Sequence, residues 1–131
     1  MVLASVTRLR LRSARHLLGF FRHAARSLKA ARGAAGNLGA EVRRTKRLAF
    51  WTLTVWESEE AMRAYVKAPP HREAMAKLAG WCDEAAYTRW RHEGETPPDW
   101  DDAARHLLAS GRLSKVDRPS QRQSAGEIAT D

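Results

Sequence analysis

Apolar and polar residues alternate with a period of two in some parts of the chain and follow helical spacing in others. Residues 2–12 and 85–93 alternate as β-strands do, with leucines and threonine on one side of the first and arginines on the other. Residues 49–56 form a short apolar run rich in aromatic and β-branched residues, which also favours a strand. Residues 37–46 are more polar and are predicted as a weaker strand, joined to 49–56 by a tight turn.

Helices are predicted at residues 14–32, 59–68, 71–78 and 100–110. Ser13, Ser58 and Asp99 are suitable N-cap residues for three of them, because their side-chain oxygens can accept hydrogen bonds from free backbone N–H groups. Pro69 and Pro70 separate the second helix from the third. A glycine follows the first, third and fourth helices. These signals set the expected ends of each helix.

The order of elements is therefore strand, helix, two strands, two short helices, strand and a final helix. This order predicts an α+β fold of the ferredoxin-like split βαβ type, with a four-stranded antiparallel sheet and helices on one face. Residues 1–111 are expected to form this domain. Residues 112–131 are polar and show no pattern, so they are predicted to form a disordered C-terminal tail.

The strand at 49–56 carries bulky residues on both of its faces. Trp51, Leu53 and Val55 share one face, whereas the other face holds Phe50, Thr52, Thr54 and Trp56. Because helices on one side of a sheet can cover only one face, the simplest cover for the other is the sheet of a second copy. The sequence thus predicts a homodimer; the alternative is a central strand with one open aromatic face.

Composition indicates a single soluble domain with an uneven charge. The chain has 131 residues and a net charge of +8, and twelve of its 23 Lys and Arg residues lie before Leu48, together with one acid. No apolar run reaches the ~18 residues of a membrane span. The single cysteine excludes an intrachain disulfide and predicts a cytoplasmic location. The basic start also resembles a transit peptide, but its folding signals favour an ordered segment.

The basic N-terminal third suggests a binding surface for polyanions as one alternative. Arginines of the first strand and of the first helix could bind nucleic acid or an anionic membrane. No aromatic residues are interleaved with them for base stacking, which makes a nucleic-acid partner the less favoured hypothesis.

Several kinds of chemistry have no support in the sequence. Motifs of the types GxGxxG, GxSxG and P-loop are absent, so no nucleotide cofactor is expected. His16 and His23 stand two helical turns apart, which is the wrong spacing for a shared metal ion. The acids that follow Cys82 would raise its pKa, which argues against a nucleophilic thiol. No metal site is predicted.

The best candidates for chemistry are His71 and Tyr65. His71 follows two prolines at a predicted helix start, where the helix dipole would lower its pKa and favour a neutral base. Tyr65 could place a phenol in a cleft. Trp56, Trp81 and Trp90 could form an aromatic wall for a planar substrate. The alternative for each aromatic residue is ordinary packing in the core.

Three stretches, FWTLTVWESEEAMRAY, HREAM and WCDEAAYTRW, resemble the dimeric α+β-barrel superfamily. Within it, the antibiotic-biosynthesis-monooxygenase-like and spheroidene-monooxygenase-like proteins are the most similar groups. The resemblance implies a ferredoxin-like protomer, a dimer formed through the sheets, and a ligand cleft between sheet and helices. The haem-degrading members use an asparagine, a tryptophan and a histidine, but this chain offers Ser5 or Thr7, Tyr65 and Met75 at those positions. Haem degradation is therefore not expected.

The sequence therefore predicts a homodimer that binds an apolar aromatic or isoprenoid small molecule and oxygenates it as a monooxygenase. Ligand contacts are expected from the residues Thr7, Trp56, Tyr65, Met75, Trp81 and Trp90, and His71 is expected to be the base. No cofactor is expected, and haem is the alternative. The rival hypotheses are a non-catalytic ligand-binding or structural dimer and a basic surface module.

Overall fold

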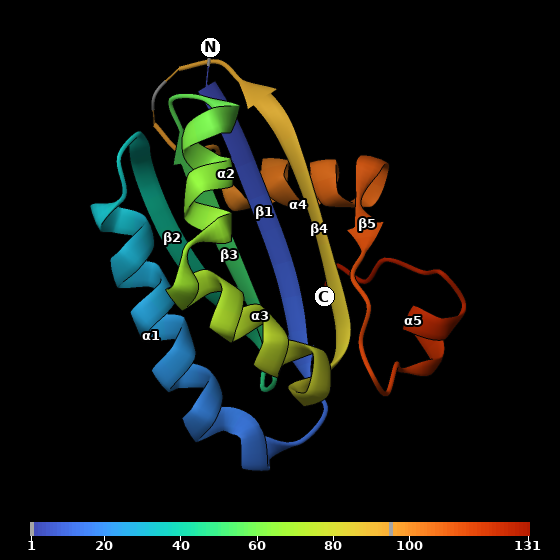
Figure 1. Cartoon of the computed structure of the whole chain (residues 1–131). Coiled ribbons are helices and arrows are strands. Elements are labelled where there is room, and N and C mark those ends of the chain that lie inside the picture. Colours follow the sequence, from blue (N-terminus) through green and yellow to red (C-terminus); the bar gives the residue numbers. More distant parts are fainter. Residues whose placement is uncertain (1, 95) are drawn as a thin grey trace.

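The computed structural model describes residues 2–94 and 96–131, which form one antiparallel sheet with helices on both sides (Figure 1). The strands are β1 (Val2–Leu11), β2 (Asn37–Lys46), β3 (Ala49–Trp56), β4 (Cys82–His92) and β5 (Arg112–Leu113). Their order across the sheet is β2-β3-β1-β4-β5. Strand β1 lies between β3 and β4, with Val6 opposite Leu53 on one side and Thr88 on the other.

The ferredoxin-like α+β fold is confirmed, with two corrections: one to the number of strands and one to the helices, which lie on both faces of the sheet instead of one. The predicted four-stranded sheet has a fifth strand, β5, which pairs with Ala86 and Tyr87 at the free edge of β4. Two residues are too short to produce a readable alternation, and their pairing depends on α4 delivering the chain to that edge. Sequence periodicity could not have revealed this strand.

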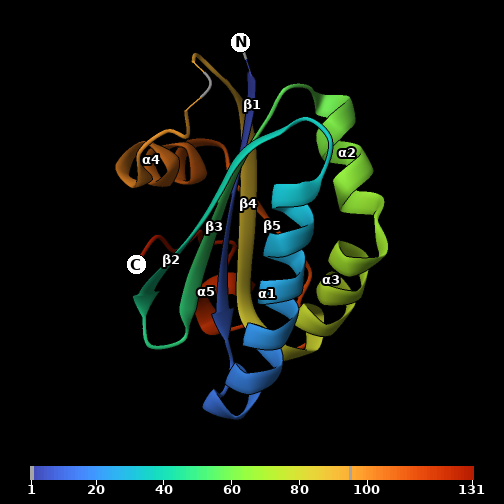
Figure 2. The same ribbon diagram turned by 90° about the vertical axis from the view of Figure 1, so that its left-hand side faces the viewer.

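Three helices lie side by side on one face of the sheet (Figure 2). They are α1 (Leu17–Gly33), α2 (Glu59–Lys67) and α3 (Pro69–Trp81). A 3₁₀ turn, η1 (Ala14–His16), precedes α1, and the predicted cap Ser13 accepts a hydrogen bond from the Arg15 N–H. Ser58 caps α2 by accepting from the Ala61 N–H. Both N-terminal signals were therefore correct.

The third helix is longer than the sequence suggested. It begins at Pro69 rather than His71, because proline at the first helical position has a suitable φ and needs no N–H partner. It continues through Gly80 to Trp81 and passes directly into β4 at Cys82. A glycine inside a helix costs only about 1 kcal/mol, so Gly80 was a weak stop signal.

Gly36 makes the close passage from α1 to β2. Its φ is +83°, a conformation that side chains rarely adopt, and a Cβ there would lie 2.5 Å from the Cβ of Ala61. The connection thereby brings the N-terminus of α2 against the end of α1.

Strand alternation gives the sheet two different faces. We call the face carrying Thr52 and Thr54 the inner face, since α1, α2 and α3 cover it, and the face carrying Trp51 and Leu53 the outer face. The predicted division of β3 between two faces is correct. A core cluster that includes Phe20, Phe50 and Leu78 lies on the inner face.

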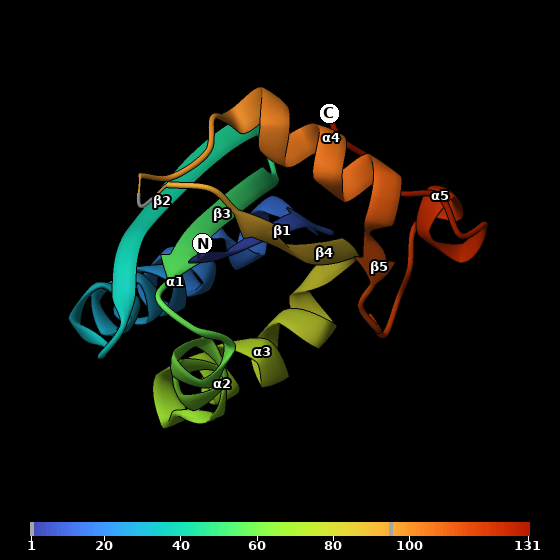
Figure 3. The ribbon, with the colours of Figure 1, turned by 90° about the horizontal axis from the view of Figure 1, so that it is seen from above.

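The outer face is covered by the same chain. Helix α4 (Trp100–Ser110) lies across it, opposite α2 and α3 (Figure 3). Ala103 and Leu107 of α4 are fully buried against Trp51 and Leu53. Burial of this face therefore does not require a second sheet. The homodimer stays a prediction, which the mass of the protein in solution can test, but its original reason now has an intramolecular explanation.

Residues 112–131 are ordered by contacts with the sheet, which differs from the disordered tail expected from the sequence. Helix α5 (Gln121–Ser124) places the Gln123 side chain beside β4, where it accepts from the Ala85 N–H and donates to the Ser114 carbonyl. The Gln123 amide thus makes the pair of backbone hydrogen bonds with Ala85 that a neighbouring strand would make. The polar composition that suggested disorder supplies the hydrogen bonds that hold the segment.

An ionic cluster of Arg8, Glu84, Arg122 and Asp131 joins this segment to the outer face. The Arg8 guanidinium is 2% exposed and lies 3.0 Å from both the Glu84 and Asp131 carboxylates. Arg122 lies 2.9 Å from Glu84. Burial alone would raise the pKa of Glu84, but hydrogen bonds from Arg122, Ser120 and Arg8 hold it below its ordinary value. The cluster therefore remains ionised at neutral pH.

Within residues 2–94 and 96–131, no helix is both long and apolar enough to cross a membrane.

Candidate functional site

A cavity of about 360 Å³ lies between the inner face and α1, α2 and α3. It crosses the sheet from Val42 on β2 to Arg89 on β4. This volume is near the lower limit of the ~300–1,000 Å³ that ligand sites usually have. The site therefore suits a compact molecule of a few rings or a short chain.

The floor of the cavity is a set of four hydroxyl residues, which we call the hydroxyl floor. It consists of Ser5 and Thr7 on β1 and Thr52 and Thr54 on β3. The register places Ser5 opposite Thr54 and Thr7 opposite Thr52, so the four side chains form two adjacent cross-strand pairs. Each hydroxyl can donate or accept a hydrogen bond. A ligand lying on this floor would meet polar groups beneath an otherwise apolar space.

An aromatic group stands at one side of the cavity. The Trp56 and Tyr65 rings are stacked with centroids 5.2 Å apart, and the His71 ring meets Tyr65 edge-on at 5.1 Å. The Tyr65 hydroxyl donates to the Ser27 carbonyl on α1 at 3.0 Å. This hydrogen bond joins α1 and α2 above the sheet. The Tyr65 hydroxyl proton is therefore not free to be donated to a ligand.

Burial controls the ionisation of both candidate catalytic residues. Burial lowers the pKa of His71, the Val66 backbone acts in the opposite direction, and the nearby Arg89 charge lowers the pKa again. The net shift is downward, so His71 is neutral at pH 7. Burial raises the pKa of Tyr65. The Nδ1 atom of His71 is buried and has no hydrogen-bond partner among the described residues. A neutral imidazole beside an apolar cavity can act as a general base.

The structure gathers five of the predicted site residues around this cavity and separates two others. Thr7, Trp56, Tyr65, His71 and Met75 all line it. Their roles in binding or catalysis remain predictions, but the grouping that the sequence suggested exists.

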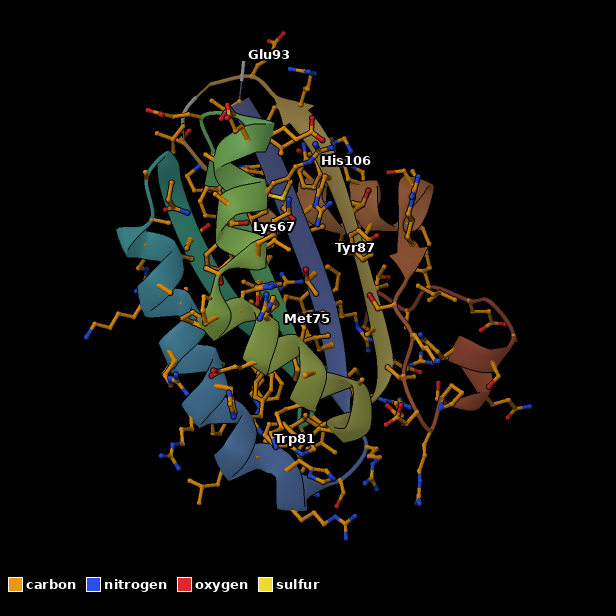
Figure 4. The ribbon with its side chains drawn as sticks, in the orientation of Figure 1. Lys67, Met75, Trp81, Tyr87, Glu93 and His106 are labelled. Carbon is orange, nitrogen blue, oxygen red and sulfur yellow. The ribbon has the colours of Figure 1, made fainter. Side chains whose placement is uncertain are left out.

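Trp81 and Trp90 do not line the cavity, so the predicted wall of three tryptophans is wrong. Trp81 lies at the end of α3, apart from Met75, and stacks on His16 (Figure 4). Trp90 points to the outer face and stacks on His106 of α4 at 4.1 Å. Strand alternation sends Trp90 away from the inner face, and helix length carries Trp81 beyond the cavity.

Sequence reasoning missed several polar residues of the lining, among them His23, Arg72, Tyr87 and Arg89. His23 is on α1 and Arg72 is in the first turn of α3, where charged side chains usually face solvent. The alternation of β4 did place Tyr87 and Arg89 on one face, and this signal could have identified them. It required knowing that this face is the inner one.

Other candidate chemistry is not supported by the geometry. Burial raises the pKa of the Cys82 thiol to about 12, and the Asp83 carboxylate acts in the same direction, so a thiolate is disfavoured. Among the residues that the structure describes, no three His, Cys, Asp or Glu side chains form a group able to hold a metal ion. His16 and His23 both contact the Trp81 ring instead.

The fold and the cavity define a class: ferredoxin-like α+β proteins with a ligand-sized space between sheet and helices. The sequence profile of the antibiotic biosynthesis monooxygenase family matches residues 15–77, which extend from η1 into α3. The resemblance to antibiotic-biosynthesis-monooxygenase-like proteins is therefore confirmed. No protein with a curated description matches the chain in sequence.

Several solved structures share this fold. SnoaB, a cofactor-independent oxygenase from Streptomyces nogalater, superposes with a TM-score of 0.61 at 17% identity, over 75% of this chain and 98% of that one. Rv0793 from Mycobacterium tuberculosis has a TM-score of 0.65 at 11% identity, covering 72% and 97%. A conserved protein from Methanosarcina mazei Go1 also has a TM-score of 0.65, at 12% identity, covering 71% and 94%. These identities establish the fold alone.

Proposed function

We propose that this protein binds a compact apolar molecule, aromatic or isoprenoid, in the inner-face cavity and oxygenates it as a monooxygenase without a cofactor. The observation that carries the proposal is the meeting of His71, Tyr65 and Trp56 at a cavity with a hydroxyl floor. The fold shared with a cofactor-independent oxygenase supports the same reading.

For a phenolic substrate the reaction balances with molecular oxygen alone. His71 takes the phenol proton, and the phenolate transfers one electron to O₂, which gives a phenoxyl radical and superoxide. The two combine at a hydrogen-bearing ring carbon as a peroxide anion, which takes the proton back from His71. The resulting hydroperoxide loses water to leave a carbonyl. One oxygen atom enters the product, and the other leaves as water. The substrate is therefore its own reductant.

The residues of the site have separate roles in this scheme. His71 is the base, since its lowered pKa leaves it neutral and able to accept a proton at pH 7. Tyr65, which is stacked on the fully buried Trp56, provides an aromatic surface for the substrate ring. The hydroxyl floor can donate hydrogen bonds to the developing phenolate oxygen. Tyr65 acts by position, because its own proton is held by the Ser27 carbonyl.

Haem does not fit this site well. A macrocycle in the cavity would lie with one face on the four polar side chains of the hydroxyl floor, in a volume of about 360 Å³. The His23 and His71 imidazoles are packed against Trp81 and Tyr65, respectively. We therefore route no step through haem. A Soret band after incubation of the protein with haem would contradict this part of the proposal.

The test uses 1,5-dihydroxynaphthalene, a two-ring phenol of suitable size, with oxygen uptake and quinone absorbance as readouts. We expect turnover that needs no added metal or cofactor and falls by about 10²-fold or more in His71→Gln. His92→Gln is the matched control, because His92 does not line the cavity. Equal rates for wild type and His71→Gln would overturn the assignment of the base.

The second candidate function is non-catalytic ligand binding in the same cavity. The predominantly apolar lining supports it equally well. It predicts that the naphthalenediol binds without consuming oxygen, and that His71→Gln changes affinity only.

A further inference from the structure

The charged side chains that line the cavity are both cationic. They are Arg72 on α3 and Arg89 on β4, and no Asp or Glu belongs to the lining. Neither guanidinium has a carboxylate within 4 Å among residues 2–94 and 96–131, whereas Arg8, Arg10 and Arg122 each do. The cavity thus carries positive charge without a counterion from the described chain.

The polarity of the cavity differs between its two ends. At the β2 end the lining is apolar and consists of Val42 with Ala24, Leu28 and Ala31 of α1. At the β4 end it includes Tyr87, Arg89 and Ser114. Val42 and Arg89 are both exposed, so each end reaches the surface. A ligand that matches this gradient has an apolar body and one polar end.

The Arg89 guanidinium is positioned at the β4 end by aromatic contact. It lies 5.1 Å from the centroid of the Tyr87 ring, which orients the cation without neutralising it. Its charge contributes to the lowered pKa of His71, so Arg89 and His71 lie in one region of the cavity. Glu57, Glu59 and Arg89 line a second hollow together, but neither carboxylate lies within 4 Å of the Arg89 guanidinium.

We propose that the ligand of the cavity carries one anionic group of the carboxylate class, which Arg89 binds at the β4 end, with Arg72 of α3 as the second cation of the lining. Its apolar body then extends over the hydroxyl floor toward Val42. This inference rests on the proposed function only in using the same cavity. An arginine binds a carboxylate through two parallel N–H donors, and such charge-assisted bonds are stronger than neutral ones. A cation without a counterion beside an apolar space favours this ligand over a neutral one.

The test compares 2-naphthoate with its neutral isostere 2-naphthamide by isothermal titration calorimetry at low salt. We expect wild-type protein to bind the carboxylate roughly tenfold to hundredfold more tightly than the amide. Arg89→Gln should bring the ratio near one, Arg72→Gln should lower it, and Arg89→Lys should keep a preference. Arg91→Gln is the control, since Arg91 is on the same strand but outside the lining. Thermal unfolding of each variant verifies that it is folded.

Equal affinity for the two probes, or no binding of either, would overturn the inference. An equal loss for both probes in Arg89→Gln would also do so, because it would indicate a packing role. Oxygenation of the neutral naphthalenediol by a protein that shows no preference for the carboxylate would leave the proposed function intact and reject the anionic ligand alone. A preference for the carboxylate without any turnover would support the ligand class and reject the oxygenase.

Discussion

The two faces of the sheet come from the same strands and differ in nearly every physical respect. On the outer face, Trp51 and Leu53 have no exposed surface and pack directly on α4. On the inner face, the intervening Thr52 and Thr54 are half-buried and border a cavity. Successive residues of β3 therefore serve a solid core and an open site in turn.

This difference shows how one protein can hold a cavity and remain stable. A cavity removes packing contacts, and each missing contact weakens the fold. The dense outer face, with its large apolar residues and the ionic cluster, can offset that loss. Variants on the two faces should consequently differ in what they change: stability on the outer face, and ligand binding or activity on the inner face.

The largest effect is expected from cutting into the outer face. Leu53→Ala should lower the free energy of unfolding by about 2–5 kcal/mol, because the surrounding α4 and sheet cannot close the space. Thr54→Ala, one residue further on the inner face, should cost under about 1 kcal/mol. Urea denaturation followed by circular dichroism measures both. Similar losses for the two variants would mean that the faces are packed alike.

A slightly smaller loss is expected from Glu84→Gln in the ionic cluster. Removal of this carboxylate leaves the buried Arg8 charge partly uncompensated, which costs about 3 kcal/mol when a buried pair is broken. The native pKa of Glu84 is lowered, so its stabilisation is complete above about pH 4.3, the unfolded value, and is lost as the pH falls through the native pKa. The urea midpoints of wild type and variant should therefore differ at pH 7 and approach one another only as the pH falls below about 4.3 and through the native pKa, which a series from pH 7 to about pH 2 measures. Parallel curves would contradict this assignment.

Much of the contrast between the two faces could be predicted from the sequence. The features that could not be predicted all depend on contacts between residues far apart in the chain. Strand alternation predicted that Trp51 and Leu53 lie on the opposite face from Thr52 and Thr54. Ser58 predicted the start of α2. The sequence did not reveal that α4 covers the outer face. An amphipathic pattern shows that a helix packs against something, but not against which surface. The ordered C-terminal segment depends on Gln123 and Asp131 finding partners about 40 and more than 80 residues away.

The candidate site was predictable to the extent that it depends on local pattern. Tyr65 and His71 stood out by helix position, and Trp56 stood out by strand face. Arg89 could not be recognised before the inner face was known, since its alternation with Trp90 fits either orientation. Trp90 was assigned to the cavity for the same reason, and its stacking on His106 corrects that choice.

A moderate effect of pH is expected from the inner face. The native pKa of His71 is lowered, so below about pH 6.5 the unfolded chain binds a proton at His71 that the native protein does not bind. The free energy of unfolding therefore falls as the pH drops from about 6.5 toward the native pKa. His71→Gln should lose this part of the pH dependence. Urea midpoints of both proteins between pH 5 and 8 provide the measurement, and identical slopes would contradict it.

The smallest effect is expected on the exposed side of α4. Leu108 is 65% exposed and belongs to neither core cluster, so Leu108→Ala should change the free energy of unfolding by less than about 0.5 kcal/mol. Leu107→Ala, its fully buried neighbour, should cost about 2–5 kcal/mol. The pair tests whether α4 covers the outer face with the side that the structure shows. Reversed effects would mean that the helix lies with its other side against the sheet.

Helix α4 follows, in the sequence, the strands that it covers, and this order has a consequence for biosynthesis. Strands β1, β3 and β4 can pair once the first 92 residues have left the ribosome, but the side chains that shield Trp51 and Leu53 belong to residues made afterwards. During that interval the nascent sheet presents a broad, sticky surface to other growing chains. Fast translation of residues 100–110, or a chaperone that binds the uncovered outer face, would then increase the yield of folded protein.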